Sequence, residues 1–83
     1  MYRVEVIPSA QKDLDNLEKR FFEQIKGRVN SLKSNPRPPH CLKLTAEEGY
    51  RIRSGDFRIL YRIDDKNKII YIYRIKHRKE SYR

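Results

Sequence analysis

Hydrophobic and basic residues alternate in two runs that meet at Ser-Gly-Asp, within the stretch YRIRSGDFRILYRI of residues 50–63. In the first run, Tyr50 and Ile52 share one face, with arginines between and after them. In the second run, one face carries Phe57, Ile59, Tyr61 and Ile63. A period of two is typical of a strand with one packed face, and a glycine between two such runs is typical of a tight turn. The pattern therefore predicts a β-hairpin.

This hairpin brings arginines from both strands close together. Arg51 and Arg53 lie on the first strand, and Arg58 lies on the second. Guanidinium groups on one small sheet repel each other unless an anion binds among them. We therefore interpret the cluster as a candidate anion-binding site and the rest of the chain as its scaffold.

The residues before the hairpin predict a strand followed by a helical segment. Alternation over residues 2–7 predicts the strand, and Ser9 is the expected N-cap of the helical segment. The next apolar residues recur every three or four positions, as in an amphipathic helix. They are Leu14, Leu17, Phe21, Ile25, Val29 and Leu32. The pattern fits one helix or a hairpin of two helices, and the prolines within residues 34–39 end it.

The remaining residues predict a loop, a turn and one more strand. Residues 34–49 are expected to form a loop with a short extended piece at 41–44, and residues 64–68 a turn. Residues 69–75 are strongly β-branched and aromatic, and both of their alternating faces are apolar. This pattern predicts a central strand that is covered on both faces. Residues 76–83 form a short, highly charged tail.

The order of these elements predicts an α+β fold. It consists of an N-terminal strand, a helical segment, most simply two helices in a hairpin, and three antiparallel strands in a small, mainly antiparallel sheet. The 83 residues allow one domain, spanning 1–83, with a modest core.

The net charge of +9 is unevenly placed, because residues 50–83 carry eleven Lys/Arg against four Asp/Glu. This excess indicates an anionic partner, either nucleic acid or an acidic protein or both. Cys41 is the only cysteine, so no internal disulfide can form, and we expect a cytoplasmic protein. The chain shows no signal segment and no apolar stretch of membrane-spanning length, so no membrane partner is expected.

The run YRIRSGDFRILYRI and the ending HRKESY of residues 77–82 resemble two motifs of the RelE/ParE toxin superfamily. Members share a pattern like YR-x-R-x-GDYR-x-x-Y and a C-terminal HR-x-x-x-Y, in this order. The resemblance spans nearly the whole chain and implies a RelE-like fold. It also implies a toxin of a type II toxin–antitoxin pair.

The basic residues and the terminal Arg–Tyr pair favour the RelE branch of this superfamily. That branch implies a ribosome-dependent, metal-free endoribonuclease (an mRNA interferase) that blocks translation by cutting mRNA. The cut proceeds by attack of a 2′-hydroxyl on the adjacent phosphate. The ParE branch implies instead a DNA gyrase inhibitor without chemistry of its own. A third hypothesis is a catalytically idle basic module that binds nucleic acid with strong salt dependence.

Several residues have expected roles in a RelE-type enzyme. Arg58 is predicted to clamp phosphate, since guanidinium groups match phosphate oxygens. By resemblance, Arg78 stabilises the transition state, and Tyr82 stacks on a base or moves a proton. His77 is a further catalytic candidate, as acid or base. The predicted RNA-binding residues are Arg51, Arg53 and Arg62.

The identity of the general base stays open between His77 and Tyr82. An arginine does not give up its proton in proteins, so Arg51 and Arg53 do not fill this role. The adjacent His40 and Cys41 lack zinc-ligand spacing, and we expect neither a metal site nor a cofactor. The expected partners are a cognate acidic antitoxin, the ribosome, and mRNA in the ribosomal A site.

Overall fold

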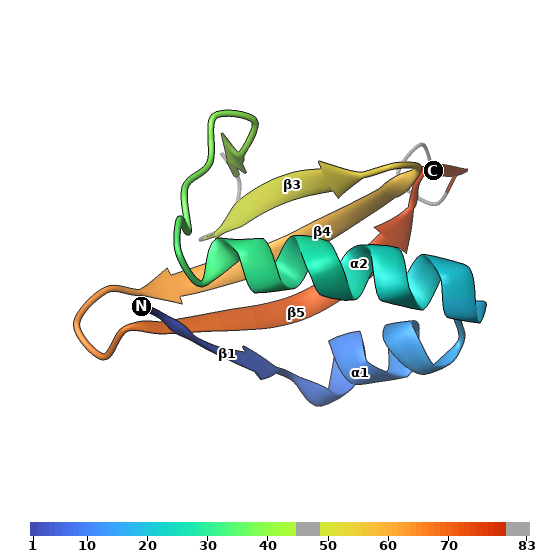
Figure 1. Cartoon of the computed structure of the whole chain (residues 1–83), viewed down its shortest axis with the longest axis horizontal. Helices are drawn as coiled ribbons and strands as arrows, with labels where there is room; N and C mark the ends of the chain where they lie inside the picture. Colours follow the sequence, from blue (N-terminus) through green and yellow to red (C-terminus); the bar gives the residue numbers. More distant parts are fainter. Residues whose placement is uncertain (45–48, 80–83) are drawn as a thin grey trace.

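Across the residues described by the computed structural model, 1–44 and 49–79, two helices pack with one five-stranded sheet (Figure 1). The elements in chain order are β1 (Arg3–Val6), α1 (Pro8–Asp15), α2 (Lys19–Leu32), β2 (Leu42–Lys43), β3 (Tyr50–Ser54), β4 (Phe57–Asp64) and β5 (Ile69–His77). The predicted α+β fold is confirmed. The helical segment is a pair of helices, and the short extended piece predicted at 41–44 is β2.

The sheet has the strand order β1-β5-β4-β3-β2. The β3–β4 pair is the predicted hairpin, and Gly55 in its turn has a φ of 61°, which a glycine adopts without steric cost. β1 pairs with β5 in parallel, and the other pairs are antiparallel. The prediction of a mainly antiparallel sheet is therefore confirmed. β5 lies inside the sheet between β1 and β4, and the middle strand of the order is β4.

A β-bulge in β5 changes which of its residues face the helix. Leu60 pairs with Arg74, whereas the next β4 residue, Tyr61, pairs with Ile72, so Tyr73 is an extra residue on β5. The bulge reverses the alternation, and the buried residues of β5 that share one face are Ile70, Ile72 and Ile75. The bulge explains part of the double apolar pattern of this strand, because it moves Ile75 to the face of Ile70 and Ile72, whereas Ile69 lies on the other face and is also buried.

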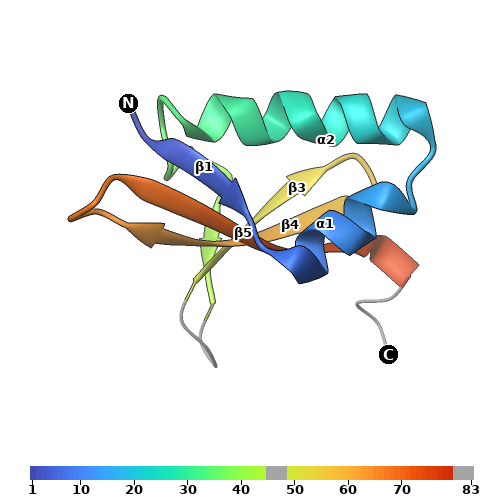
Figure 2. The same ribbon diagram turned by 90° about the horizontal axis from the view of Figure 1, so that it is seen from below.

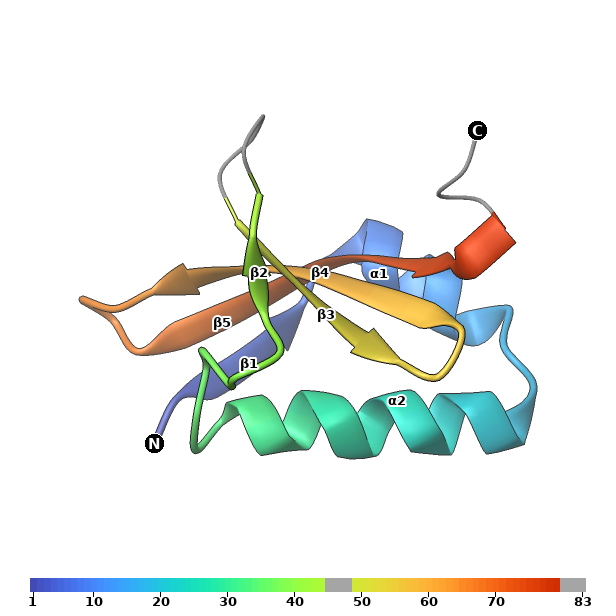
Figure 3. The ribbon, with the colours of Figure 1, turned by 90° about the horizontal axis from the view of Figure 1, so that it is seen from above.

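α2 lies over one face of the sheet, and among the described residues no helix lies over the other face (Figures 2 and 3). Ile25 and Leu32 of α2 are fully buried against the strands. Their strand partners in the core are Ile52, Phe57, Ile59, Tyr61, Ile70, Ile72 and Ile75. Burial of these apolar side chains is the main stabilising term of the fold. We call the face opposite α2 the open face.

α1 lies beside the edge of β5 where β1 has ended. It begins at Pro8, whose fixed φ suits the first helical turn. The N-cap position is Ile7, without a side-chain cap, so the prediction of Ser9 as N-cap is wrong. Ser9 Oγ instead donates a hydrogen bond to the Tyr73 carbonyl at 2.7 Å. In the described part of the chain, neither helix is long and apolar enough to cross a membrane.

Candidate functional site

Three cationic side chains lie in register across the open face. Arg53 of β3 pairs with Arg58 of β4, and Arg58 pairs with Lys76 of β5. Side chains opposite each other on neighbouring strands have Cβ atoms about 4.5–5.5 Å apart. We call Arg53, Arg58 and Lys76 the cation row. Like charges directly opposite one another destabilise a sheet, so the row favours binding of an anion.

A second set of basic residues borders the cation row on the same face. Arg51 pairs with Leu60, which pairs with Arg74. Arg74 is held by Asp13 of α1, with 3.0 Å between Nε and Oδ2. Farther along β4, the exposed Arg62 places its guanidinium 5.2 Å from the centre of the Tyr73 ring. Four of the predicted site residues, Arg51, Arg53, Arg58 and Arg62, therefore lie on one face.

Lys76 is a site residue that the sequence prediction missed. The sequence pattern predicts a strand that ends at Ile75, with Lys76 in the charged tail. β5 instead continues to His77, which places Lys76 opposite Arg58. Only the register across the bulge shows this pairing, and the sequence carries no clear signal of a bulge.

His77 lies on the opposite face of the sheet from the cation row. Its cross-strand partner is Phe57, and the two rings meet edge to face with centroids 5.1 Å apart. The Lys79 backbone N–H donates to Nδ1 of His77 at 3.2 Å. In the neutral ring this bond leaves the proton on Nε2, so Nε2 is a donor.

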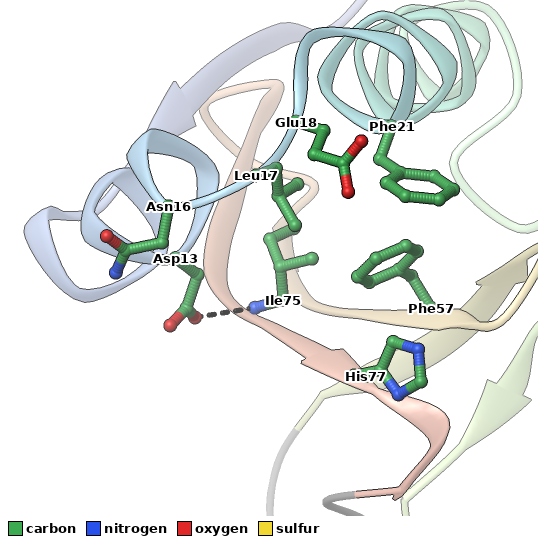
Figure 4. A pocket seen from close by; sticks show the side chains of 8 residues that line it. All are labelled: Asp13, Asn16, Leu17, Glu18, Phe21, Phe57, Ile75 and His77. Carbon is green, nitrogen blue, oxygen red and sulfur yellow. Dashed lines mark hydrogen bonds between the residues drawn. The ribbon is translucent and has the colours of Figure 1, made fainter.

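A cavity of about 410 Å³ lies next to His77, between the helix pair and the ends of β4 and β5 (Figure 4). Its lining includes Leu17, Glu18, Phe21 and Phe57. The Phe21 and Phe57 rings pack with centroids 5.3 Å apart. His77 therefore sits in a partly aromatic environment on the side of α2, and the structure does not bring it to the open face.

Arg78 follows β5 at the end of the sheet where the β3–β4 turn lies. Its backbone N–H donates to the Asp56 carbonyl at 2.6 Å, which fixes the start of the tail against that turn. The Arg78 side chain is exposed. Tyr82, the other predicted residue of the tail, lies outside the described residues.

A separate polar cluster fastens the loop after α2 to the β4–β5 turn. Arg37 forms a two-pronged contact with Asp65, at 3.2 and 2.8 Å, and also donates to the Tyr50 hydroxyl. Tyr2 donates to Asp65 at 2.6 Å. The hydrogen bonds from Arg37, and then that from Tyr2, lower the pKa of Asp65 to about 2. The hydrogen bond to Asp65 likewise raises the pKa of Arg37. This cluster holds the loop after α2 against the β4–β5 turn, and we call it the Arg37–Asp65 lock.

Within residues 1–44 and 49–79, no group of three His, Cys, Asp or Glu side chains could hold a metal ion. The charged groups of the cation row are guanidinium and ammonium groups. Such groups bind phosphate oxygens and stabilise negative charge that develops on them.

Comparison with known proteins gives the family. A sequence model described as ParE toxin of type II toxin–antitoxin system, parDE, matches residues 4–82. The chain belongs to the RelE/ParE toxin superfamily. The toxin is 30% identical over 86 residues to the putative toxin RelE1 of Methanocaldococcus jannaschii, covering 99% of this chain and 96% of the relative. With this relative, the toxin is assigned to the RelE type.

Solved structures of RelE toxins share the toxin's fold. One is in the RelE–RelB complex from Pyrococcus horikoshii, with 30% identity, a TM-score of 0.79, and coverage of 93% of this chain and 94% of that chain. Another is in the RelBE2 toxin–antitoxin complex from Mycobacterium tuberculosis. There the identity is 31%, the TM-score is 0.83, and coverage is 93% and 98%.

Proposed function

We propose that this RelE-type toxin is an endoribonuclease that cuts mRNA in the A site of the ribosome. The cation row carries the proposal, because three strands each contribute one cation to a single stretch of the open face. Arg78 joins this region through its backbone bond to the β3–β4 turn. Such a surface suits the phosphate backbone of RNA.

The proposed reaction needs no metal. The 2′-oxygen attacks the adjacent phosphorus and the bond from phosphorus to the 5′-oxygen breaks, which leaves a 2′,3′-cyclic phosphate and a 5′-hydroxyl. A base takes the 2′ proton, an acid protonates the leaving oxygen, and cations stabilise the crowded phosphorane. Arg58 clamps the phosphate and Arg78 stabilises its developing charge.

Proton transfer is assigned to the tail. His77 lies on the face opposite the cation row, and its Nδ1 already accepts a backbone hydrogen bond. This placement favours Tyr82 over His77 as the proton acceptor. A tyrosine titrates near 10, so the cationic surroundings would have to favour its ionised form.

An acidic antitoxin is the proposed partner of the toxin in the cytoplasm. The relatives of known structure include RelE proteins bound to RelB. The net charge of +9 suits an acidic protein that covers the open face. Co-expression with the neighbouring open reading frame is expected to yield a stable complex, and the absence of a complex at micromolar concentration contradicts the proposal.

The paired replacement of Arg58 and Arg78 by Ala tests the assignment. The double variant is expected to lose mRNA cleavage while its thermal unfolding stays cooperative. A matched control removes two exposed cations elsewhere, Lys12 and Lys66, and is expected to cut normally. Unchanged cutting by the Arg58→Ala/Arg78→Ala protein would contradict the proposal.

Inhibition of DNA gyrase is the second candidate function, because the matching family model describes ParE toxins. A supercoiling assay separates the two functions. Inhibition of gyrase together with intact mRNA would establish the ParE-type activity.

A further inference from the structure

We propose that Lys76 binds RNA phosphate, together with Arg53 and Arg58, the other two members of the cation row. The identity of the anion as RNA rests on the proposed function. The position of Lys76 in the cation row rests on the strand register alone.

The bulge at Tyr73 places Lys76 on the open face. Ile72 faces α2, and regular alternation from Ile72 would direct Arg74 and Lys76 toward α2 as well. The extra residue reverses this order and pairs Lys76 with Arg58. Bulges occur next to active sites, where they re-aim side chains. In this sheet the bulge moves both Arg74 and Lys76 to the open face.

The basic side chains in and beside the cation row differ in whether a carboxylate lies next to them. Arg74, which borders the cation row, has the Asp13 carboxylate as its partner at 3.0 Å. In the part of the chain that the structure describes, no carboxylate oxygen lies within 4.0 Å of the Lys76 ammonium or the Arg53 guanidinium. The fold therefore neutralises Arg74 with a carboxylate and leaves Lys76 and Arg53 without one within this distance.

The length of the cation row suits a polyanion. Neighbouring strands are about 4.8 Å apart, so three strands carry the row over roughly 10 Å. Lys76 is half-buried, which limits the freedom of its stem, and its ammonium acts as a point charge. The cation row can therefore contact oxygens of more than one phosphate along the RNA chain.

Binding to a 2′-O-methyl RNA oligonucleotide tests the proposal without requiring cleavage, because the probe has no 2′-hydroxyl nucleophile. Affinity is measured by fluorescence anisotropy at several salt concentrations. Lys76→Ala is expected to weaken binding several-fold and to reduce the slope of log K against log salt by about 0.7, the value for one phosphate contact on a single strand. Lys76→Arg is expected to restore both quantities, since arginine keeps the charge.

Matched controls separate the role of Lys76 from a change in fold or in total charge. Lys66→Ala removes one exposed cation from the β4–β5 turn and is expected to leave the slope unchanged. If Lys76→Ala unfolds, Lys76→Gln takes its place, because its longer side chain retains more of the packing. A wild-type slope in a folded Lys76→Ala or Lys76→Gln protein would overturn the proposal.

A cleavage assay with the same variants distinguishes phosphate binding from proton transfer. Lys76→Arg is expected to cut RNA on ribosomes at close to the wild-type rate. Normal binding by Lys76→Arg with lost cutting would show that the ammonium group is needed in the reaction itself, which overturns a role confined to phosphate binding. If the wild type cuts no RNA, the proposed function fails, while the binding series still decides the role of Lys76.

Discussion

Asp13 and Arg74 join α1 to the bulged strand, with 3.0 Å between the Arg74 Nε and the Asp13 Oδ2. The same oxygen accepts the backbone N–H of Ile75 at 2.9 Å. β1 has already left this edge of β5, so Asp13 supplies the acceptor that a neighbouring strand would otherwise provide. One carboxylate thus holds the strand segment immediately before Lys76.

Asp13→Ala is expected to lower the free energy of unfolding by about 1–3 kcal/mol, because it leaves the Ile75 N–H without its acceptor. Urea denaturation measures this change. Asp15→Ala, which removes an exposed carboxylate from the same helix, is expected to stay within about 0.5 kcal/mol of wild type. Equal stabilities for the two variants would show that the Asp13 contacts contribute little.

The Arg37–Asp65 lock makes stability depend on pH in the acidic range. The pKa of Asp65 is about 2 in the folded protein, below its ordinary value of 3.8. A depressed folded pKa contributes stability that is present above about pH 4 and is lost as the pH falls toward 2. The raised pKa of Arg37 adds no dependence in this range, since arginine stays charged.

Asp65→Asn is therefore expected to flatten the fall in the urea midpoint between pH 4 and pH 2. The variant keeps the part of the slope that comes from Asp64, whose pKa is also lowered, by hydrogen bonds from the Asn67 side chain and backbone. A slope identical to that of the wild type would contradict the assignment of the lock to Asp65.

Alanine substitutions at two glycines are expected to have opposite effects. Gly49 has a φ of 137°, and a Cβ there would lie 2.9 Å from the Tyr61 carbonyl oxygen, so Gly49→Ala is expected to destabilise the fold by about 1–3 kcal/mol. Gly27 lies in α2, and a Cβ there would have no heavy atom within 4 Å, so Gly27→Ala is expected to stabilise by about 0.5–1 kcal/mol. Thermal unfolding of both variants checks the pair.

The hairpin and its arginine cluster could be predicted from sequence because alternation and turn chemistry are local signals. The face shared by Arg53 and Arg58 follows directly from their pairing across the turn. The position of Lys76 could not be predicted, since it depends on one extra residue in β5 and on non-local pairing. The placement of His77 opposite Phe57 depends on the same register.

The helical region shows the same limit. The apolar periodicity continues through Leu17 and Phe21, although the chain turns between α1 and α2. Both helices bury apolar residues, so the spacing alone does not separate them. The edge contacts of Ser9 and Asp13 with β5 join residues more than 60 positions apart, and no local pattern encodes them.

Ribosome-dependent cleavage is tested most directly by mapping new RNA 5′ ends in a translation extract programmed with one defined message, with and without the toxin. We expect cuts within codons that disappear when ribosomes are omitted and when Arg58 and Arg78 are both replaced by Ala. An intact message in the presence of folded toxin and active ribosomes would contradict the proposed function.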